Sequence, residues 1–159
     1  MRSLLQAFLL IFASPLVIAD AKVNQIITIL QDVPVITHVD VGSAGASHGD
    51  LMAFEAPFET ESGEKGIMSG FLLTVDIPVG QGEYFHDRVA QIVFEFGGVD
   101  TIAVGGKSVY PDGRAEMQAH VQQVRPVIGG TGRFIGARGE IATTRRDQGH
   151  YEHIITLVD

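Results

Sequence analysis

The sequence contains no cysteine, and this absence removes several classes of site at once. A disulfide framework, a thiol nucleophile and a thiolate metal centre are all excluded. The stability of the fold must therefore come from packing, and a hydrophobic content of 45% permits a sizeable core. Asn24 is the only asparagine, and the Gln25-Ile26 that follows it completes no glycosylation sequon, so no N-linked glycan is expected.

Clustered positive charge is also lacking. Lysine and arginine are scattered along the chain, and the formal net charge is −8. A negative protein without a basic patch repels phosphate backbones, so nucleic acid is not an expected partner. The histidines show no ligand spacing, and His150 and His153 would face opposite sides of a strand. We therefore expect neither a metal nor any other cofactor.

Long apolar runs are scarce. The run from Leu4 to Ile18 follows the positive Arg2 and precedes the small residues of Ala19-Asp20-Ala21. This order is typical of a secretory signal peptide, and the run is shorter than the roughly 20 residues that span a bilayer. We expect residues 1–21 to be a signal peptide and residues 22–159 to form one secreted or periplasmic domain with no membrane span after cleavage. A retained membrane anchor is the alternative.

Sustained 3.6-residue periodicity is absent from the rest of the chain. Apolar segments of strand length recur between glycine, proline and charged turns, which is the pattern of an all-β protein. The predicted strands are Gln25–Asp32, Leu51–Phe58, Ile67–Ile77, Val89–Phe96, Thr101–Tyr110, Met117–Ile128, Arg133–Thr144 and Tyr151–Val158, with a short additional one at Val35–Val41. Short connections favour antiparallel pairing, since a parallel pair needs a crossover of about a dozen residues or more.

Many of these strands are apolar on both faces, for example Ile26 to Leu30 and Gly70 to Val75. A sheet with one wet face alternates more cleanly. Eight such strands bury both faces if the sheet closes, with one face filling the interior and the other covered by neighbouring subunits. We therefore predict an all-β, closed eight-stranded antiparallel β-barrel. A two-sheet sandwich is the alternative.

The segment from Gly129 to Gly139, GGTGRFIGARG, resembles the GGTGxFxxARG signature of plant dirigent proteins and a similar segment of the related allene oxide cyclases. Weaker matches lie in the same order along the chain: Gly49-Asp50-Leu51 with Phe54, Gly66 and Gly70, Phe94 to Gly97, Val104 with Gly106, and, upstream, Thr28 to Asp32. The resemblance implies a calycin-type barrel, commonly a homotrimer, with an apolar cavity for a lipid-like or phenolic small molecule.

The glycines of this segment favour a structural role. Gly129 to Gly132 predict a tight turn that requires positive φ, and Gly136 and Gly139 predict bulges or close approach in a curved strand. A phosphate-binding loop needs a helix after the glycines, whereas a strand pattern follows here. Nucleotide binding is therefore not expected.

The resemblance implies a cofactor-free isomerase or cyclase, in which a hydrophobic chamber orders a reactive intermediate and a few polar groups stabilise charge or move a proton. Asp32 matches the dirigent aspartate at the end of the first strand, and Arg138 matches the arginine of the signature, so both are predicted catalytic residues. Strand alternation places Arg138 on one face with Phe134, Gly136 and Glu140. The alternatives are a turn-organising role for Asp32 and an Arg138–Glu140 ion pair on the rim.

The predicted ligand-binding residues are aromatic or apolar side chains of the chamber and polar side chains that interrupt apolar strands. They are Phe54, Leu72, Asp76, Glu95, Tyr110, Phe134, Glu140 and Tyr151. Lone carboxylates in strands more often face solvent, which is the alternative for Asp76 and Glu95. The two tyrosines either donate hydrogen bonds to a bound carbonyl or lie on the barrel rim with the hydroxyl in water.

The sequence as a whole predicts an exported barrel that binds a hydrophobic small molecule and guides its cyclisation, isomerisation or stereoselective coupling. A non-catalytic carrier of a lipophilic ligand, with the cavity used as lipocalins use theirs, is one alternative. A structural protein whose barrel is filled by side chains is another.

Overall fold

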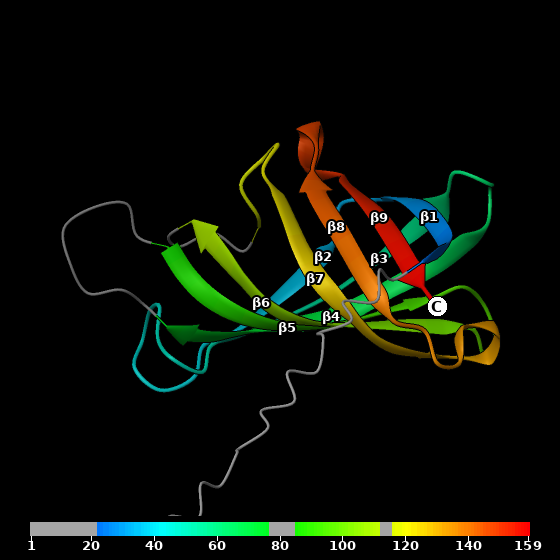
Figure 1. The fold of residues 1–159 in the computed structure, drawn as a ribbon. Coiled ribbons are helices and arrows are strands. Elements are labelled where there is room, and N and C mark those ends of the chain that lie inside the picture. Colours follow the sequence, from blue (N-terminus) through cyan, green and yellow to red (C-terminus); the bar gives the residue numbers. More distant parts are fainter. Residues whose placement is uncertain (1–21, 77–84, 112–115) are drawn as a thin grey trace, which may run out of the picture.

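The computed structural model describes residues 22–76, 85–111 and 116–159 (Figure 1). The elements are β1 (Val23–Gln31), β2 (Val35–Val39), β3 (Leu51–Thr60), β4 (Lys65–Asp76), β5 (Phe85–Glu95), β6 (Thr101–Pro111), β7 (Gln122–Thr131), the 3-10 turn η1 (Gly132–Phe134), β8 (Gly139–Arg145), the 3-10 turn η2 (Asp147–Gly149) and β9 (Tyr151–Val158). The predicted signal peptide, residues 1–21, lies outside the described residues. In the described ranges, no helix has the length and apolar character needed to cross a membrane.

Antiparallel pairs close the strands into a barrel. From β1 the order runs through β9, β8, β7, β6, β5 and β4 to β3, and β3 pairs again with β1. The additional strand β2 follows a break at Pro34, which has no N–H to donate to a ladder. β2 pairs with the first half of β3, and β1 pairs with its last residues, so both lie along the same edge of β3. The predicted closed eight-stranded antiparallel barrel is confirmed, with one strand added.

The predicted strand Arg133–Thr144 is wrong in its first half. Gly132 to Phe134 form η1, and β8 begins only at Gly139. Gly132 has a φ of 58°, which glycine adopts without strain, and a Cβ at this position would collide with the Asp100 side chain. The turn of the signature segment therefore begins at Gly132, while the preceding glycines remain in β7.

The predicted strand Met117–Ile128 also begins too early, since β7 starts at Gln122. The segment before it makes one isolated bridge, between Ala119 and Arg145. His120 has a φ of 61°, which no regular strand contains. The turn at this residue explains why the apolar pattern from Met117 onward does not form a single strand.

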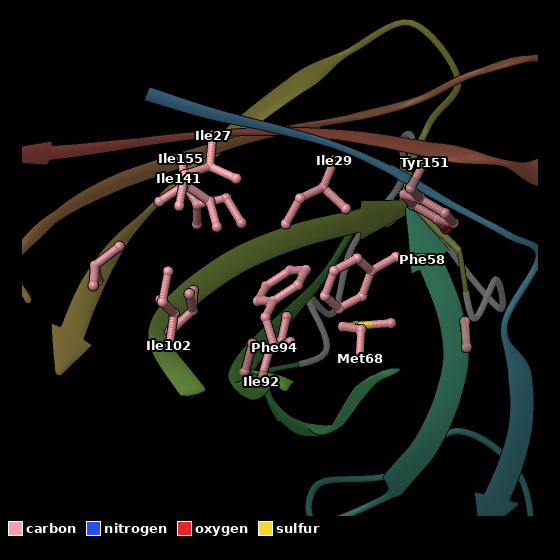
Figure 2. Packing of buried hydrophobic residues seen from close by; sticks show 14 of the residues in the cluster. Ile27, Ile29, Phe58, Met68, Ile92, Phe94, Ile102, Ile141, Tyr151 and Ile155 are labelled. Atoms are coloured by element: carbon pink, nitrogen blue, oxygen red, sulfur yellow. The ribbon is translucent and has the colours of Figure 1, made fainter. Parts of the chain in front are cut away.

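Alternation along the strands places one set of side chains inside the barrel, as the burial pattern of β9 illustrates. Apolar members of this set pack against one another inside the barrel (Figure 2). The Phe58 ring meets the rings of Phe94 and Phe96 edge-on at centroid distances of 5.7 and 5.2 Å, and Phe96 lies 5.0 Å from Phe134. These rings and their apolar neighbours form the packed half of the barrel. Full burial of each large apolar side chain there contributes about 1.5–3 kcal/mol to stability.

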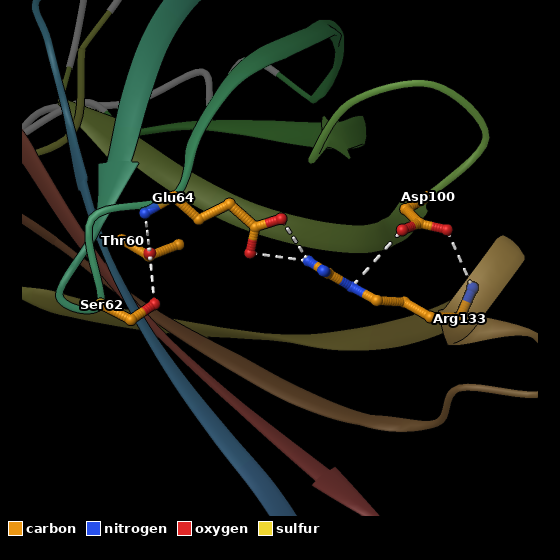
Figure 3. Close-up of polar contacts among 5 residues, drawn as sticks. All are labelled: Thr60, Ser62, Glu64, Asp100 and Arg133. Carbon is orange, nitrogen blue, oxygen red and sulfur yellow. Dashed lines mark hydrogen bonds and ion pairs between the residues drawn. The ribbon is translucent and has the colours of Figure 1, made fainter.

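Arg133 joins three turns at the packed half of the barrel (Figure 3). Its Nη2 donates to both carboxylate oxygens of Glu64, at 2.7 Å each, and its Nε lies 3.7 Å from Oδ2 of Asp100. The guanidinium carbon lies 5.4 Å from the ring centroid of Phe96 and 4.7 Å from that of Phe134. Glu64 belongs to the turn between β3 and β4, and Asp100 to the turn between β5 and β6.

We call Glu64, Asp100 and Arg133 the clasp, and this end of the barrel the clasp end. The opposite end, where β4, β6 and β8 end and β9 begins, is called the mouth. The clasp connects three turns that are distant in sequence.

Candidate functional site

Near the mouth the inward-facing positions carry polar side chains instead of apolar ones. The buried polar residues there are Gln31, Thr74, Arg88, Ser108, Arg125, Thr143 and His153, together with the phenols of Tyr110 and Tyr151. Each takes its inward direction from the same alternation that points apolar residues inward at the clasp end. The barrel interior therefore divides into an apolar half and a polar half.

A cavity of about 50 Å³ lies where these two halves meet. Its apolar wall consists of Pro34, Ile36, Phe54, Met68, Leu72, Ile92 and Met117. Its polar wall consists of Gln31, Tyr110, Arg125, Thr143, Tyr151 and His153. A mostly apolar pocket with a few convergent polar groups is the usual form of a small-molecule site.

Arg125 on β7 is the charged group of this polar wall, and it is only 2% exposed. Its Nη2 donates to the Tyr110 hydroxyl at 3.0 Å, and its Nε has no hydrogen-bond partner. Within the described parts of the chain, no aspartate or glutamate forms an ion pair with it. A guanidinium in this position keeps donors and a positive charge directed at the cavity.

Tyr110 lies between two buried guanidinium groups. Arg125 donates to its hydroxyl, and the guanidinium carbon of Arg88 lies 4.8 Å from the centroid of its ring. Burial raises the pKa of Tyr110, although the charges of Arg125 and Arg88 oppose this shift. Burial lowers the pKa of Arg88, against the opposing effect of Tyr110 and Asp50. Tyr110 is therefore a neutral phenol that can donate a hydrogen bond into the cavity.

A chain of hydrogen bonds fixes the neutral ring of His153. The amide nitrogen of Gln31 donates to the backbone oxygen of Asp32, which leaves the Gln31 Oε1 to accept from His153 Nε2 at 2.7 Å. His153 Nδ1 then accepts from the Thr143 hydroxyl at 3.0 Å. Burial, with a contribution from the charge of Arg125, lowers the pKa of His153 to about 3. This histidine is therefore no general base near neutral pH.

Tyr151 and Met117 cover the mouth side of the cavity. The Tyr151 ring stacks on His153 with centroids 6.2 Å apart, and its hydroxyl interacts with the backbone amide of Met117. Burial first, and then the charge of Glu116, raises the pKa of Tyr151. Arg145 Nη2 donates to Glu116 Oε2 at 2.7 Å, which holds the segment that carries Met117. Met117 is an unbranched, adaptable side chain in the lining of the cavity.

The comparisons with known proteins concern the fold. No protein-family model matches the chain, and no curated protein sequence matches it. Among solved structures, a pyocyanin demethylase is 15% identical, with a TM-score of 0.59, over 84% of this chain and 98% of that chain. The Diels–Alderase AbmU from Streptomyces koyangensis is 15% identical, with a TM-score of 0.59, over 89% and 70%. A pterocarpan synthase dirigent protein is 18% identical, with a TM-score of 0.54, over 95% and 96%.

This chain has the barrel fold of these three proteins. At such low identity the likeness concerns the fold alone. Four of the predicted ligand-binding residues line the cavity: Phe54, Leu72, Tyr110 and Tyr151. The tyrosines are buried and do not lie on the rim with their hydroxyls in water.

The other predicted ligand-binding residues lie elsewhere. Phe134 is buried at the clasp end, under the guanidinium of Arg133. Glu95 and Glu140 are exposed on the outside of the barrel. Asp76 is the last residue of β4, and its side chain lies outside the described part of the structure.

The structure does not bring the two predicted catalytic residues together. Asp32 lies just after β1, its side chain is 66% exposed, and its Oδ1 is 3.6 Å from His150 Nδ1. Arg138 is exposed in the loop between η1 and β8, at the opposite end of the barrel, so the predicted face shared with Phe134 and the buried pair with Glu140 do not form. Their catalytic roles stay predictions, and neither residue lines the cavity.

Four residues of the polar wall were not predicted, although strand alternation carries a signal for them: Gln31, Arg125, Thr143 and His153. Arg125 alternates with Val127, and His153 alternates with Ile155 and Leu157, all of which are buried. Gln31 continues the inward row of Ile27 and Ile29. In the described ranges, no group of three or more histidines, aspartates or glutamates is placed to hold a metal ion.

Proposed function

We propose that this protein binds a hydrophobic small molecule in the barrel cavity and guides its cyclisation, isomerisation or stereoselective coupling. The observation that carries the proposal is the wall asymmetry of the cavity: apolar side chains on one side, and the donors of Arg125 and Tyr110 on the other. The barrel fold shared with a Diels–Alderase and a dirigent protein supports it.

Two effects of the cavity account for such chemistry: it confines the substrate, and its donors polarise a substrate oxygen. An apolar wall that holds a flexible chain in one folded conformation removes much of the entropy cost of ring closure. Donors that are fixed before the reaction stabilise negative charge that develops on a substrate oxygen. Arg125 and Tyr110 supply these donors, and their positions are set by neighbouring strands β7 and β6.

The size of the cavity limits what fits without movement. A volume of about 50 Å³ accommodates only a few water molecules, so a larger ligand requires side chains of the mouth to change rotamer. Met117, which is unbranched, is the side chain best suited to this change. We propose that the ligand is admitted at the mouth, because the clasp and the aromatic core fill the other end.

The activity is tested with the purified protein and three substrate classes: fatty epoxides, conjugated polyenes and phenolic radicals. Products are separated by mass and by chiral chromatography. We expect turnover or enantiomeric enrichment with the wild type and with Gln91→Trp on the outer face, and loss of both with Leu72→Trp, which fills the cavity. Equal product distributions from the wild type and Leu72→Trp would contradict the proposal.

A non-catalytic carrier is the second candidate, and one observation favours it. No carboxylate belongs to the described lining of the cavity, and the low pKa of His153 leaves no group there that accepts a proton near neutral pH. Native mass spectrometry of protein purified from its own host distinguishes the candidates. A retained, unmodified ligand supports the carrier, whereas product released by an empty protein supports the catalyst.

We also propose that the protein is exported and assembles as a homotrimer. The apolar run and small-residue site of residues 1–21 support export, and a mass of the secreted form that begins at Lys22 would verify it. Exposed apolar side chains on the outer face of neighbouring strands β4, β5 and β6, including Phe71, Val89 and Val109, support subunit contact. A monomer in sedimentation equilibrium at micromolar concentration would exclude the trimer.

A further inference from the structure

We infer that the ligand of this barrel is an organic acid, and that Arg125 binds its ionised carboxylate. The inference rests on the proposed function, because it takes the cavity as the ligand site. It goes further by naming the chemical class of the ligand and the residue that recognises it. Three features of the polar wall carry it.

The first feature is a buried positive charge without a compensating anion. Arg125 is 2% exposed, and its hydrogen bond to the neutral Tyr110 hydroxyl leaves its Nε without an acceptor. Buried charges are ordinarily paired, because transfer of an unpaired ion out of water costs several kcal/mol. Arg125 thus retains unused capacity for an anion.

The second feature is the neutrality of the other polar side chains that line the cavity with Arg125. Burial keeps the Tyr110 phenol protonated and the His153 ring unprotonated. Two described carboxylates near the mouth have other partners: Glu116 accepts from Arg145 at 2.7 Å, and Asp50 accepts from the backbone N–H groups of Val41 and Ser47. Among the described residues, the neighbouring side chains therefore supply no counter-charge to Arg125, and an incoming anion would supply it.

The third feature is the position of this cation beside an apolar wall. Phe54, Met68, Leu72 and Ile92 line the same cavity as Arg125. A guanidinium presents donors in a planar fork that matches a carboxylate, and charge-assisted hydrogen bonds of this kind are shorter and stronger than neutral ones. A molecule with an apolar body and one carboxylate satisfies both walls, whereas an alcohol, an ester or an amide leaves the charge unpaired.

Matched acid and amide probes test the inference, because they share their shape and differ in charge. Binding of benzoate and benzamide, and of octanoate and octanamide, is measured by calorimetry with the purified protein. The two pairs distinguish an aryl from an acyl body. We expect each acid to bind the wild type at least about tenfold more tightly than its amide, in keeping with the strength of hydrogen bonds to charged groups.

Variants assign the preference to its residue. Arg125→Gln should lower acid affinity to the level of the amide, Arg125→Lys should retain part of the preference, and Arg146→Gln, an exposed arginine, should change nothing. Circular dichroism melts establish that each variant is folded. An equal acid and amide affinity in the wild type, or a preference that survives in Arg125→Gln, would overturn the inference and leave cavity binding intact. Absence of saturable binding by all four probes would count against the proposed function itself.

Discussion

Replacement of the buried cation by an apolar side chain should stabilise the ligand-free protein. In Arg125→Met the charge that the structure leaves without an anion is removed, and methionine fills the space of the arginine stem. The substitution alone strands the Tyr110 hydroxyl, which costs about 1–3 kcal/mol. The double variant Arg125→Met/Tyr110→Phe removes both polar groups, so it is the cleaner perturbation.

The magnitude follows from the balance of burial and hydrogen bonding. The desolvation penalty of a buried ion is several kcal/mol, and a hydrogen bond to a charged group returns about 1.5–3 kcal/mol. The double variant should therefore gain about 2 kcal/mol in the free energy of unfolding. For a chain of this length each kcal/mol raises Tm by about 2–4 °C, which gives an increase of about 4–8 °C.

The assay is chemical denaturation in urea with a parallel calorimetric melt, both without ligand. Arg145→Met is the matched control: Arg145 has a carboxylate partner in Glu116, so this variant should lose about 1 kcal/mol. Benzoate should raise the Tm of the wild type and leave that of the double variant unchanged. A double variant less stable than the wild type by more than about 1 kcal/mol would show that Arg125 is compensated within the fold, and the reasoning about its charge would fail.

Three further predictions concern other residues. The pKa of His153 lies near 3 in the folded protein and at 6.5 for a histidine exposed to water, so the unfolded chain binds the proton more readily. The free energy of unfolding should therefore fall as pH drops below about 6.5, by up to about 1.4 kcal/mol per pH unit. In denaturation experiments on His153→Gln, this free energy should depend less steeply on pH. Arg133→Ala removes the clasp and should lower the free energy of unfolding by about 1–3 kcal/mol, and by less at high salt, which screens the ion pairs. A Tm within about 1 °C of the wild type would contradict a stabilising role for the clasp. Met117→Ala should cost about 2 kcal/mol or more in denaturation and should raise the affinity for naphthoate relative to benzoate several-fold in calorimetry, whereas an unchanged ratio would place the opening elsewhere.

Much of the barrel was predictable because both faces of its strands are apolar. Runs such as Ile26 to Leu30 bury one face in the core and leave the other on the outside, where Ile26 and Leu30 are exposed. The pairing of β1 with β3 closes the barrel, as the apolar pattern on both faces of the strands predicts. The glycine segment was harder, because the left-handed conformation of Gly132 decides where β7 ends and the turn begins.

The site was less predictable than the fold. Alternation indicates that Arg125 and His153 point inward, but it does not show which half of the barrel a residue occupies. That depends on register, and the pairs that bring Gln31, on the first strand, beside Tyr151, on the last, are long-range. The prediction of Asp32 and Arg138 rests on resemblance to a motif. Their positions on the surface follow from the break before Pro34 and from η1, neither of which a strand pattern contains.

The residues that pack the aromatic core and form the clasp are different from the residues that line the cavity. The aromatic packing and the clasp lie at one end of the barrel, apart from the side chains that line the cavity. Exchange of lining residues such as Leu72 or Met117 therefore alters which molecules are accepted while the scaffold persists. A library confined to those positions is accordingly a practical route to new selectivity from this protein.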